Sequence, residues 1–200
     1  VLLPSGKVLI AGGYGATGPV TTGELYDPAS NTWSSAGTLV VARYVATATV
    51  LPNGRVLLAG GQGVAGDLAS AELYDPATNA WNATGAMGAV RRAPIAALLP
   101  NGKVLVAGGY GAGGYLSSAE LYDPSTNSWT PVGAMNGARI YATGTVLPNG
   151  KVLLAGGEAI GGPQSTAEVF DPATNTWNAI APMVTARESA IASLLPSGKV

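Results

Sequence analysis

Residues 45–61 read Val-Ala-Thr-Ala-Thr-Val-Leu-Pro-Asn-Gly-Arg-Val-Leu-Leu-Ala-Gly-Gly. The first part, Val45–Leu51, is rich in β-branched residues and predicts a strand. Pro52–Gly54 predicts a tight turn in which glycine supplies a positive φ. Arg55–Ala59 is a continuous apolar run, the pattern of a strand that is covered on both faces. The stretch therefore predicts two antiparallel strands joined by a short turn.

The next 23 or so residues complete a unit of four strands. Gln62–Ser70 is a loop without strand periodicity, and Ala71–Asp75 predicts a third strand. Asp75–Asn79 predicts a second turn, because Asp and Asn side chains bond the local backbone. Trp81–Thr84 predicts a more polar outer strand, as suits an edge. Four antiparallel strands without an intervening helix are typical of a β-propeller blade.

The same unit recurs every 48 residues without insertion or deletion. Four features show the period: a glycine pair, an Asp-Pro turn, a tryptophan and an arginine. The tryptophans are Trp33, Trp81, Trp129 and Trp177. The repeat units span about 1–44, 45–92, 93–140 and 141–188, and residues 189–200 begin the next phase. We expect the rings of Trp81 and Trp129 to pack between or within blades.

The sequence resembles the kelch-repeat family of β-propellers. The resemblance rests on the glycine pair, on Tyr26, Tyr74, Tyr122 or Phe170, and on the tryptophan seven residues later, in every unit. It implies an all-β kelch-type propeller of four-stranded antiparallel blades. Kelch propellers usually have six or seven blades, so two interpretations stay open. The chain is part of a larger propeller, or Ser189–Leu195 completes the first blade and closes a ring of four.

Composition argues against several kinds of function. The net charge is −1 and only 10% of the residues are charged, so we expect no nucleic-acid partner. No apolar run is long enough for a membrane span, so no membrane insertion is expected. The chain has no His and no Cys, which excludes a Ser-His-Asp triad and the usual zinc or copper ligands. We expect no metal and no cofactor, and the copper chemistry of galactose oxidase, a kelch-like enzyme, cannot be carried over.

Most charged residues belong to the repeated scaffold. Of the 21 charged residues, only Asp67, Arg92, Glu158 and Glu188 lie outside the repeated columns. A glycosidase that uses Glu158 and Glu188 as paired carboxylates is a minor alternative. The arginine column consists of Arg43, Arg91, Arg139 and Arg187. The resemblance implies that such arginines can hold acidic peptides, but their repetition favours a structural bond within each blade, for instance to the repeated glutamate.

Variation between the units locates the candidate binding surface. The Pro-x-Gly and Asp-Pro-x-x-Asn turns hardly change and lie at one end of the blades. The loops between the second and third strands, and the connections between blades, change from unit to unit and lie at the other end. Two positions differ from unit to unit: the residue directly after the glycine pair, and the residue directly after the repeated arginine. With one further loop tyrosine, the candidate ligand-binding residues are Tyr14, Tyr44, Gln62, Arg92, Tyr110, Tyr115, Glu158 and Glu188.

These patterns favour a non-catalytic binding module that recognises a protein, peptide or glycan through this variable end. A structural propeller segment of a larger exported protein is the alternative, and a glycan-active enzyme is a third. The compartment stays open. A secreted or cell-surface bacterial protein suits the low charge and the abundance of Ala, Gly and Thr.

Overall fold

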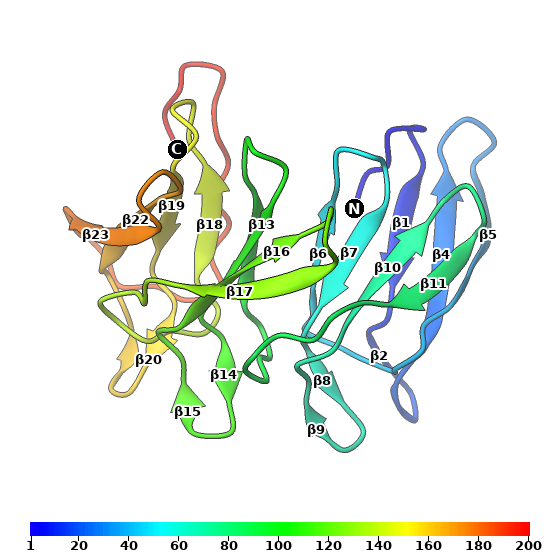
Figure 1. Cartoon of the computed structure of the whole chain (residues 1–200), viewed down its shortest axis with the longest axis horizontal. Helices are drawn as coiled ribbons and strands as arrows, with labels where there is room; N and C mark the ends of the chain where they lie inside the picture. The colour runs from blue at the N-terminus through cyan, green and yellow to red at the C-terminus, as the bar shows by residue number, and fades with distance from the viewer.

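The computed structural model describes residues 1–200 and contains strands and turns but no helix. The main strands form four antiparallel sheets, one for each repeat unit (Figure 1). The first sheet contains β1 (Val8–Ala11), β4 (Thr22–Asp27) and β5 (Thr32–Thr38). The second contains β6 (Thr47–Val50), β7 (Val56–Ala59), β10 (Ala71–Asp75) and β11 (Ala80–Ala83). The third contains β12 (Ile95–Leu98), β13 (Val104–Ala107), β16 (Ala119–Asp123) and β17 (Ser128–Val132). The fourth contains β18 (Thr143–Val146), β19 (Val152–Ala155), β22 (Ala167–Asp171) and β23 (Thr176–Ile180).

The sheets follow one another as propeller blades. The first strand β12 contacts both β6 and β18, the first strands of the neighbouring blades, and the outer strands β5 and β11 are also in contact. The first and fourth sheets lie at opposite ends of the array in Figure 1. The expected all-β propeller of antiparallel blades is confirmed. The first sheet has three strands, because Val1–Leu3 contribute only an isolated bridge between Leu2 and Val8 beside β1.

The core lies between the blades rather than within one of them. Alternate residues of β7 point to opposite neighbours: Val56 and Leu58 pack in a cluster with the first blade, and Leu57 and Ala59 in a cluster with the third. All four side chains are buried. This explains the continuous apolar run, since both faces of the strand are covered by other blades.

Two of the four tryptophans bond their outer strand to the preceding blade. The Trp81 Nε1 donates a hydrogen bond to the Ala36 carbonyl at 2.8 Å, and the Trp129 Nε1 donates to the Gly85 carbonyl at 2.7 Å. Trp33, which has no preceding blade in this chain, is 55% exposed. The predicted packing of Trp81 and Trp129 between blades is confirmed by these bonds.

Residues 189–200 follow the fourth blade, where the sequence predicts either the closing strand of the first blade or the first strand of a next blade. These residues form no strand and do not pair with β1. They do form the expected turn, with the Leu195 N–H donating to the Lys199 carbonyl at 2.8 Å. A first strand is stabilised by pairing with the second strand of its blade, and β1 pairs with β4 but not with these residues. No membrane-spanning helix is found in the structure.

Candidate functional site

The arginine column is part of the scaffold. Arg43, Arg91 and Arg139 each form an ion pair with a glutamate 29 residues later, at 2.8–2.9 Å, and these arginines are almost completely buried. The glutamates are Glu72, Glu120 and Glu168. The predicted structural role of the repeated arginine, with the repeated glutamate as its partner, is confirmed. The end members of the two columns, Arg187 and Glu24, are exposed and form no such pair.

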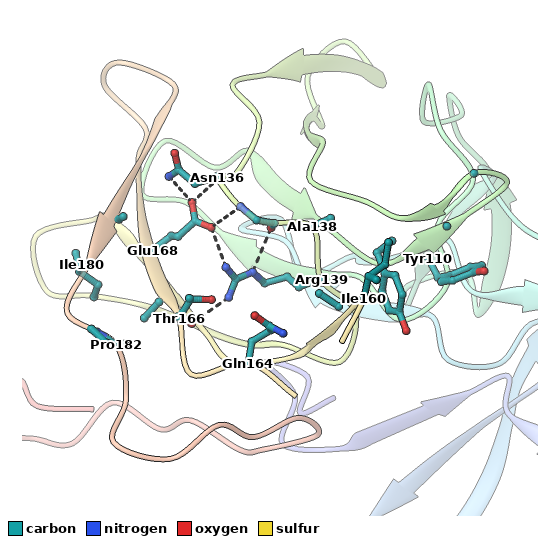
Figure 2. Close-up of a pocket in the computed structure, with 17 residues that line it drawn as sticks. Tyr110, Asn136, Ala138, Arg139, Ile160, Gln164, Thr166, Glu168, Ile180 and Pro182 are labelled. Carbon is teal, nitrogen blue, oxygen red and sulfur yellow. Dashed lines mark hydrogen bonds and ion pairs between the residues drawn. The ribbon is translucent and has the colours of Figure 1, made fainter. Parts of the chain in front are cut away.

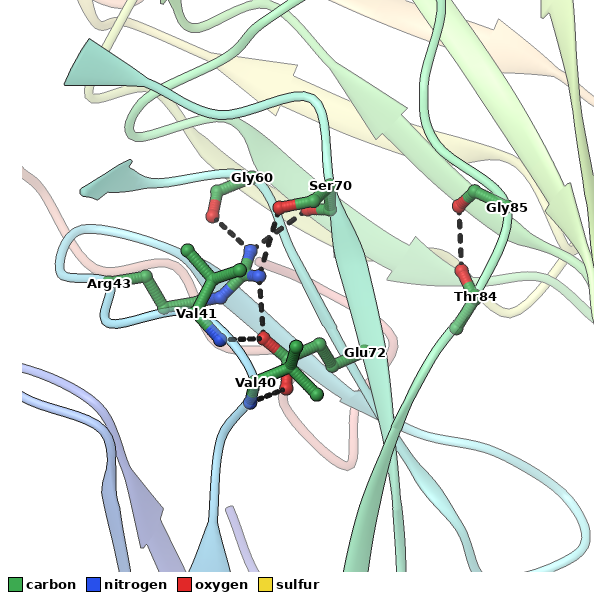
Figure 3. A network of polar contacts seen from close by, with 8 residues as sticks. All are labelled: Val40, Val41, Arg43, Gly60, Ser70, Glu72, Thr84 and Gly85. Atoms are coloured by element: carbon green, nitrogen blue, oxygen red, sulfur yellow. Dashed lines mark hydrogen bonds and ion pairs between the residues drawn. The ribbon is translucent and has the colours of Figure 1, made fainter. Parts of the chain in front are cut away.

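Figure 3 shows how one pair organises the connection between two blades. The Arg43 guanidinium donates to the Gly60 and Ser70 carbonyls as well as to Glu72. The Glu72 carboxylate also accepts hydrogen bonds from the backbone N–H groups of Val40 and Val41. Because Arg43 is 0% exposed, no edge of its guanidinium faces solvent. Acidic peptides therefore have no access to these buried arginines.

Each variable loop forms a small hairpin that the sequence did not reveal. The four hairpins consist of β2 (Tyr14–Gly15) with β3 (Gly18–Pro19), β8 (Gln62–Gly63) with β9 (Gly66–Asp67), β14 (Tyr110–Gly111) with β15 (Gly114–Tyr115), and β20 (Glu158–Ala159) with β21 (Gly162–Pro163). A glycine with positive φ recurs at the equivalent place in all four. They are Gly18, Gly66, Gly114 and Gly162. This 48-residue glycine period was the signal that could have predicted the hairpins.

The two variable columns meet in space. Isolated bridges join Tyr44 to Gln62, Arg92 to Tyr110 and Ile140 to Glu158. Each bridge therefore pairs the residue after the repeated arginine with the residue after the glycine pair. We call the surface made by the four hairpins and these bridged residues, together with Glu188, the hairpin face. Figure 1 shows the hairpins along one edge of the molecule, and the invariant turns lie at the other edge.

Aromatic side chains occupy the first part of the hairpin face. The rings of Tyr14 and Tyr44 meet edge to face with centroids 5.0 Å apart, and Tyr14 remains 68% exposed. The Tyr44 hydroxyl donates a hydrogen bond to the Gln62 side-chain oxygen. These contacts hold Tyr44 in place and leave the Tyr14 ring available to solvent.

A positively charged side chain, Arg92, lies in the middle of the hairpin face. The Arg92 guanidinium carbon is 4.4 Å from the centroid of the Tyr110 ring, and the Tyr110 and Tyr115 rings meet nearly at right angles. The Arg92 Nε lies 3.9 Å from a carboxylate oxygen of Asp67. Asp67 was missed as a site residue, although it was among the four charged residues outside the scaffold. The stacking fixes the guanidinium plane against an aromatic face.

Carboxylate side chains occupy the last part of the hairpin face. The Tyr115 hydroxyl donates a 3.1 Å hydrogen bond to Glu158, and this bond raises the pKa of Tyr115. Glu188 lies beside Glu158, and the pKa of Glu188 is raised by desolvation and then by its contact with Glu158. Neither carboxylate belongs to any of the eight ion pairs of the molecule. All eight candidate residues thus line up on one face, in the order Tyr14, Tyr44, Gln62, Arg92, Tyr110, Tyr115, Glu158 and Glu188.

A pocket of about 720 Å³ opens next to these residues, between the third and fourth hairpins (Figure 2). Tyr110, Tyr115 and Ile160 come from the two hairpins, and Ile180 and Pro182 from the end of the fourth blade. Polar groups of the pocket include Asn136, Gln164 and Thr166. No three His, Cys, Asp or Glu side chains come together in a way that could hold a metal ion.

Comparison with known protein families agrees with this architecture. A family model described as "KLHDC2/KLHL20/DRC7 Kelch-repeats domain" matches residues 1–194. No curated protein matches the chain. The matched region includes all four sheets, all four hairpins and every arginine–glutamate pair described above.

Proposed function

The chain belongs to the kelch-repeat family, whose domains are generally protein-binding modules, and from this premise we propose that it binds a protein segment through the hairpin face. The observation that carries the proposal is the alignment of eight unlike side chains along one face of a scaffold that otherwise repeats. The three arginine–glutamate pairs of the repeat are buried and neutralise each other, so these charges do not compete for a ligand.

The order in which different side chains follow one another along the hairpin face supports a peptide as the ligand. Tyrosine and arginine are the side chains most often found at the energetic centres of protein interfaces. Tyr14 lies at one end, the stacked pair Arg92 and Tyr110 in the middle, and Glu188 at the other end. Such an ordered series distinguishes the two directions of a bound chain, which identical contacts in each blade would not do. The opposite end, with its invariant turns, offers no such distinction.

The experiment selects ligands without assuming their identity. A displayed library of random twelve-residue peptides is selected on the 200-residue chain, and the affinities of the enriched peptides are measured by biolayer interferometry. We expect Arg92→Ala and Tyr110→Ala to weaken binding by roughly 30-fold, the equivalent of about 2 kcal/mol for a central contact. Both variants should keep a melting temperature near that of the parent, because these side chains are only partly buried and lie outside the inter-blade core clusters.

The control variant is Asn101→Ala, which changes an exposed turn at the other end of the blades. It should leave binding unchanged. If Asn101→Ala abolishes binding while Arg92→Ala and Tyr110→Ala do not, the ligand uses the turn end and the proposal is wrong. Failure of the library to yield any peptide that depends on Arg92 or Tyr110 would also contradict it.

A further inference from the structure

The pocket in Figure 2 has apolar walls that are open to solvent. Ile160, at the tip of the fourth hairpin, is 91% exposed, and Ile180 on the opposite wall is also exposed. Tyr110 and Tyr115 complete the wall on the side of the third hairpin. A volume of about 720 Å³ lies within the range of pockets that bind small ligands or side chains. Exposed apolar walls of this kind gain free energy when another apolar group covers them.

The charged groups that line the pocket are already neutralised. The Arg139 guanidinium bonds Glu168 at 2.9 Å and donates to the Gly156 and Thr166 carbonyls. The Glu168 carboxylate also accepts both the backbone and the side-chain N–H of Asn136, each at 2.8 Å. Every part of this ion pair that faces the pocket therefore has a partner. A charged ligand group inside the pocket would find no free counter-charge, so the pocket suits an uncharged group.

Unpaired negative charge lies beside the pocket. Tyr115 lines the pocket and donates its hydroxyl to Glu158. The Gly157 N–H donates to the Arg187 carbonyl at 2.9 Å, and this backbone bond brings Glu188 next to Glu158. No Lys or Arg of the chain lies within ion-pair distance of either carboxylate. The two carboxylates repel each other, and a cation placed between them would relieve that repulsion.

These observations rest on, and extend, the function proposed above. We propose that the pocket takes an apolar side chain of the bound protein segment, and that Glu158 and Glu188 bind a Lys or Arg side chain that lies close by in the same segment. The ligand is thus a basic peptide with an apolar anchor. Tyr115 joins the two parts, since its ring forms a wall of the pocket and its hydroxyl orients Glu158.

The test uses three pools of fluorescein-labelled six-residue peptides. Each pool has Leu at its third position and random residues elsewhere, except at the fifth position, which is Arg in the basic pool, Gln in the neutral pool and Glu in the acidic pool. Binding to the 200-residue chain is measured by fluorescence anisotropy at pH 7. We expect the basic pool to bind about fivefold tighter than the neutral pool, as for a partly exposed ion pair, and the acidic pool to bind most weakly.

Two variants test separately the contribution of the apolar pocket and that of the ion pair. The double variant Glu158→Gln/Glu188→Gln should remove the preference for the basic pool and leave a similar affinity for the neutral pool. Ile160→Ser should weaken all three pools by about tenfold, because it removes apolar area from the wall. Ile10, an exposed apolar residue of β1 outside the hairpin face, supplies the control Ile10→Ser, which should leave the affinities for all three pools unchanged. Glu24→Gln, which removes an exposed and unpaired charge in the first blade, should also leave the preference intact.

Two results would overturn the inference. One is equal binding of the basic and acidic pools, and the other is a preference for the basic pool that persists in the double variant. If none of the pools binds while selected library peptides still depend on Arg92 and Tyr110, the pocket inference fails and the proposed function stands. If the double variant melts at a lower temperature than the parent, Glu188→Gln alone replaces it and should at least halve the preference.

Discussion

The Arg91 side chain is completely buried although it carries a charged guanidinium group. Its guanidinium donates to Glu120 in β16 and to the Gly108 and Ser118 carbonyls, which directly follow β13 and precede β16. Arg91 itself lies on the connection between the second and third blades, so these bonds join that connection to the third blade. These hydrogen bonds replace the water contacts that the guanidinium loses on burial. The same arrangement occurs around Arg43 and Arg139, which explains why the repeat keeps both residue types at a fixed spacing.

Removing one partner of this pair should be costly. We predict that Arg91→Met lowers the free energy of unfolding by about 3–5 kcal/mol, because Glu120 would remain buried without a counter-charge. Urea unfolding monitored by tryptophan fluorescence measures the loss. The control is Arg55→Met, which breaks the Arg55–Asp75 pair, where the arginine side chain is 48% exposed. That variant should lose less than about 1 kcal/mol. Equal losses for the two variants would show that burial does not set the cost.

At the scale of the element, the Asp-Pro-x-x-Asn turn is a self-contained unit. The Asp123 carboxylate accepts hydrogen bonds from the backbone N–H and the hydroxyl of Ser125, and it pairs with Lys103 at 3.0 Å. The Ser125 hydroxyl and Lys103 together hold the pKa of Asp123 at about 2. Asn127 ends the turn with a φ of 55°, a left-handed conformation that asparagine tolerates. The same turn recurs in the other three units.

The lowered pKa predicts a pH-dependent contribution to stability. Because the folded-state pKa of Asp123 lies below its unfolded value, its stabilising contribution is present above pH 4 or so and is lost as the pH falls towards 2. We therefore expect Asp123→Asn to lower the melting temperature at pH 7 and to lower it progressively less between pH 4 and pH 2. Differential scanning fluorimetry of both proteins across this range measures the difference. A difference that does not change with pH would mean that the charge of Asp123 does not contribute.

At the scale of the whole molecule, stability depends on how many faces of a blade are covered. Residues of the second and third blades take part in two inter-blade clusters each, whereas those of the first and fourth blades take part in one. The strands β7 and β19 make a matched comparison, because both read Val-Leu-Leu-Ala. All four residues of β7 are buried, but Leu153 of β19 is only partly buried.

The covered strand should therefore exchange its amide hydrogens more slowly. We predict that the amides of β7 exchange at least about tenfold more slowly than those of β19, because opening β7 requires two apolar layers to separate. Identical sequences give nearly identical intrinsic rates, so the ratio reports structural protection. Hydrogen exchange followed by mass spectrometry with peptide-level resolution measures it. Equal protection in the two strands would indicate that the four blades unfold as a single unit.

The period, the strands and the separation of the two ends followed from the sequence itself. These features depend on local chemistry: β-branched runs form strands, Asn-Gly and Asp-Pro segments form turns, and the alternation of strand direction assigns each loop to an end. The apolar run within Arg55–Ala59, which forms β7 (Val56–Ala59), also predicted correctly that both faces of the strand are covered. The repetition of the arginine and the glutamate favoured a structural pairing, which the geometry confirmed.

The contacts between separate units depend on how the blades pack against one another. The pairing of Tyr44 with Gln62 and of Tyr115 with Glu158 joins residues 18 and 43 positions apart. The orientation of one blade against the next determines such contacts, and no local pattern records that orientation. The small hairpins were not predicted, because two-residue strands are too short to show the alternation of side chains that identifies a strand. Residues 189–195 have the composition of a strand but form none, because a strand is stabilised by hydrogen bonds to a neighbour, and propensity does not supply that neighbour.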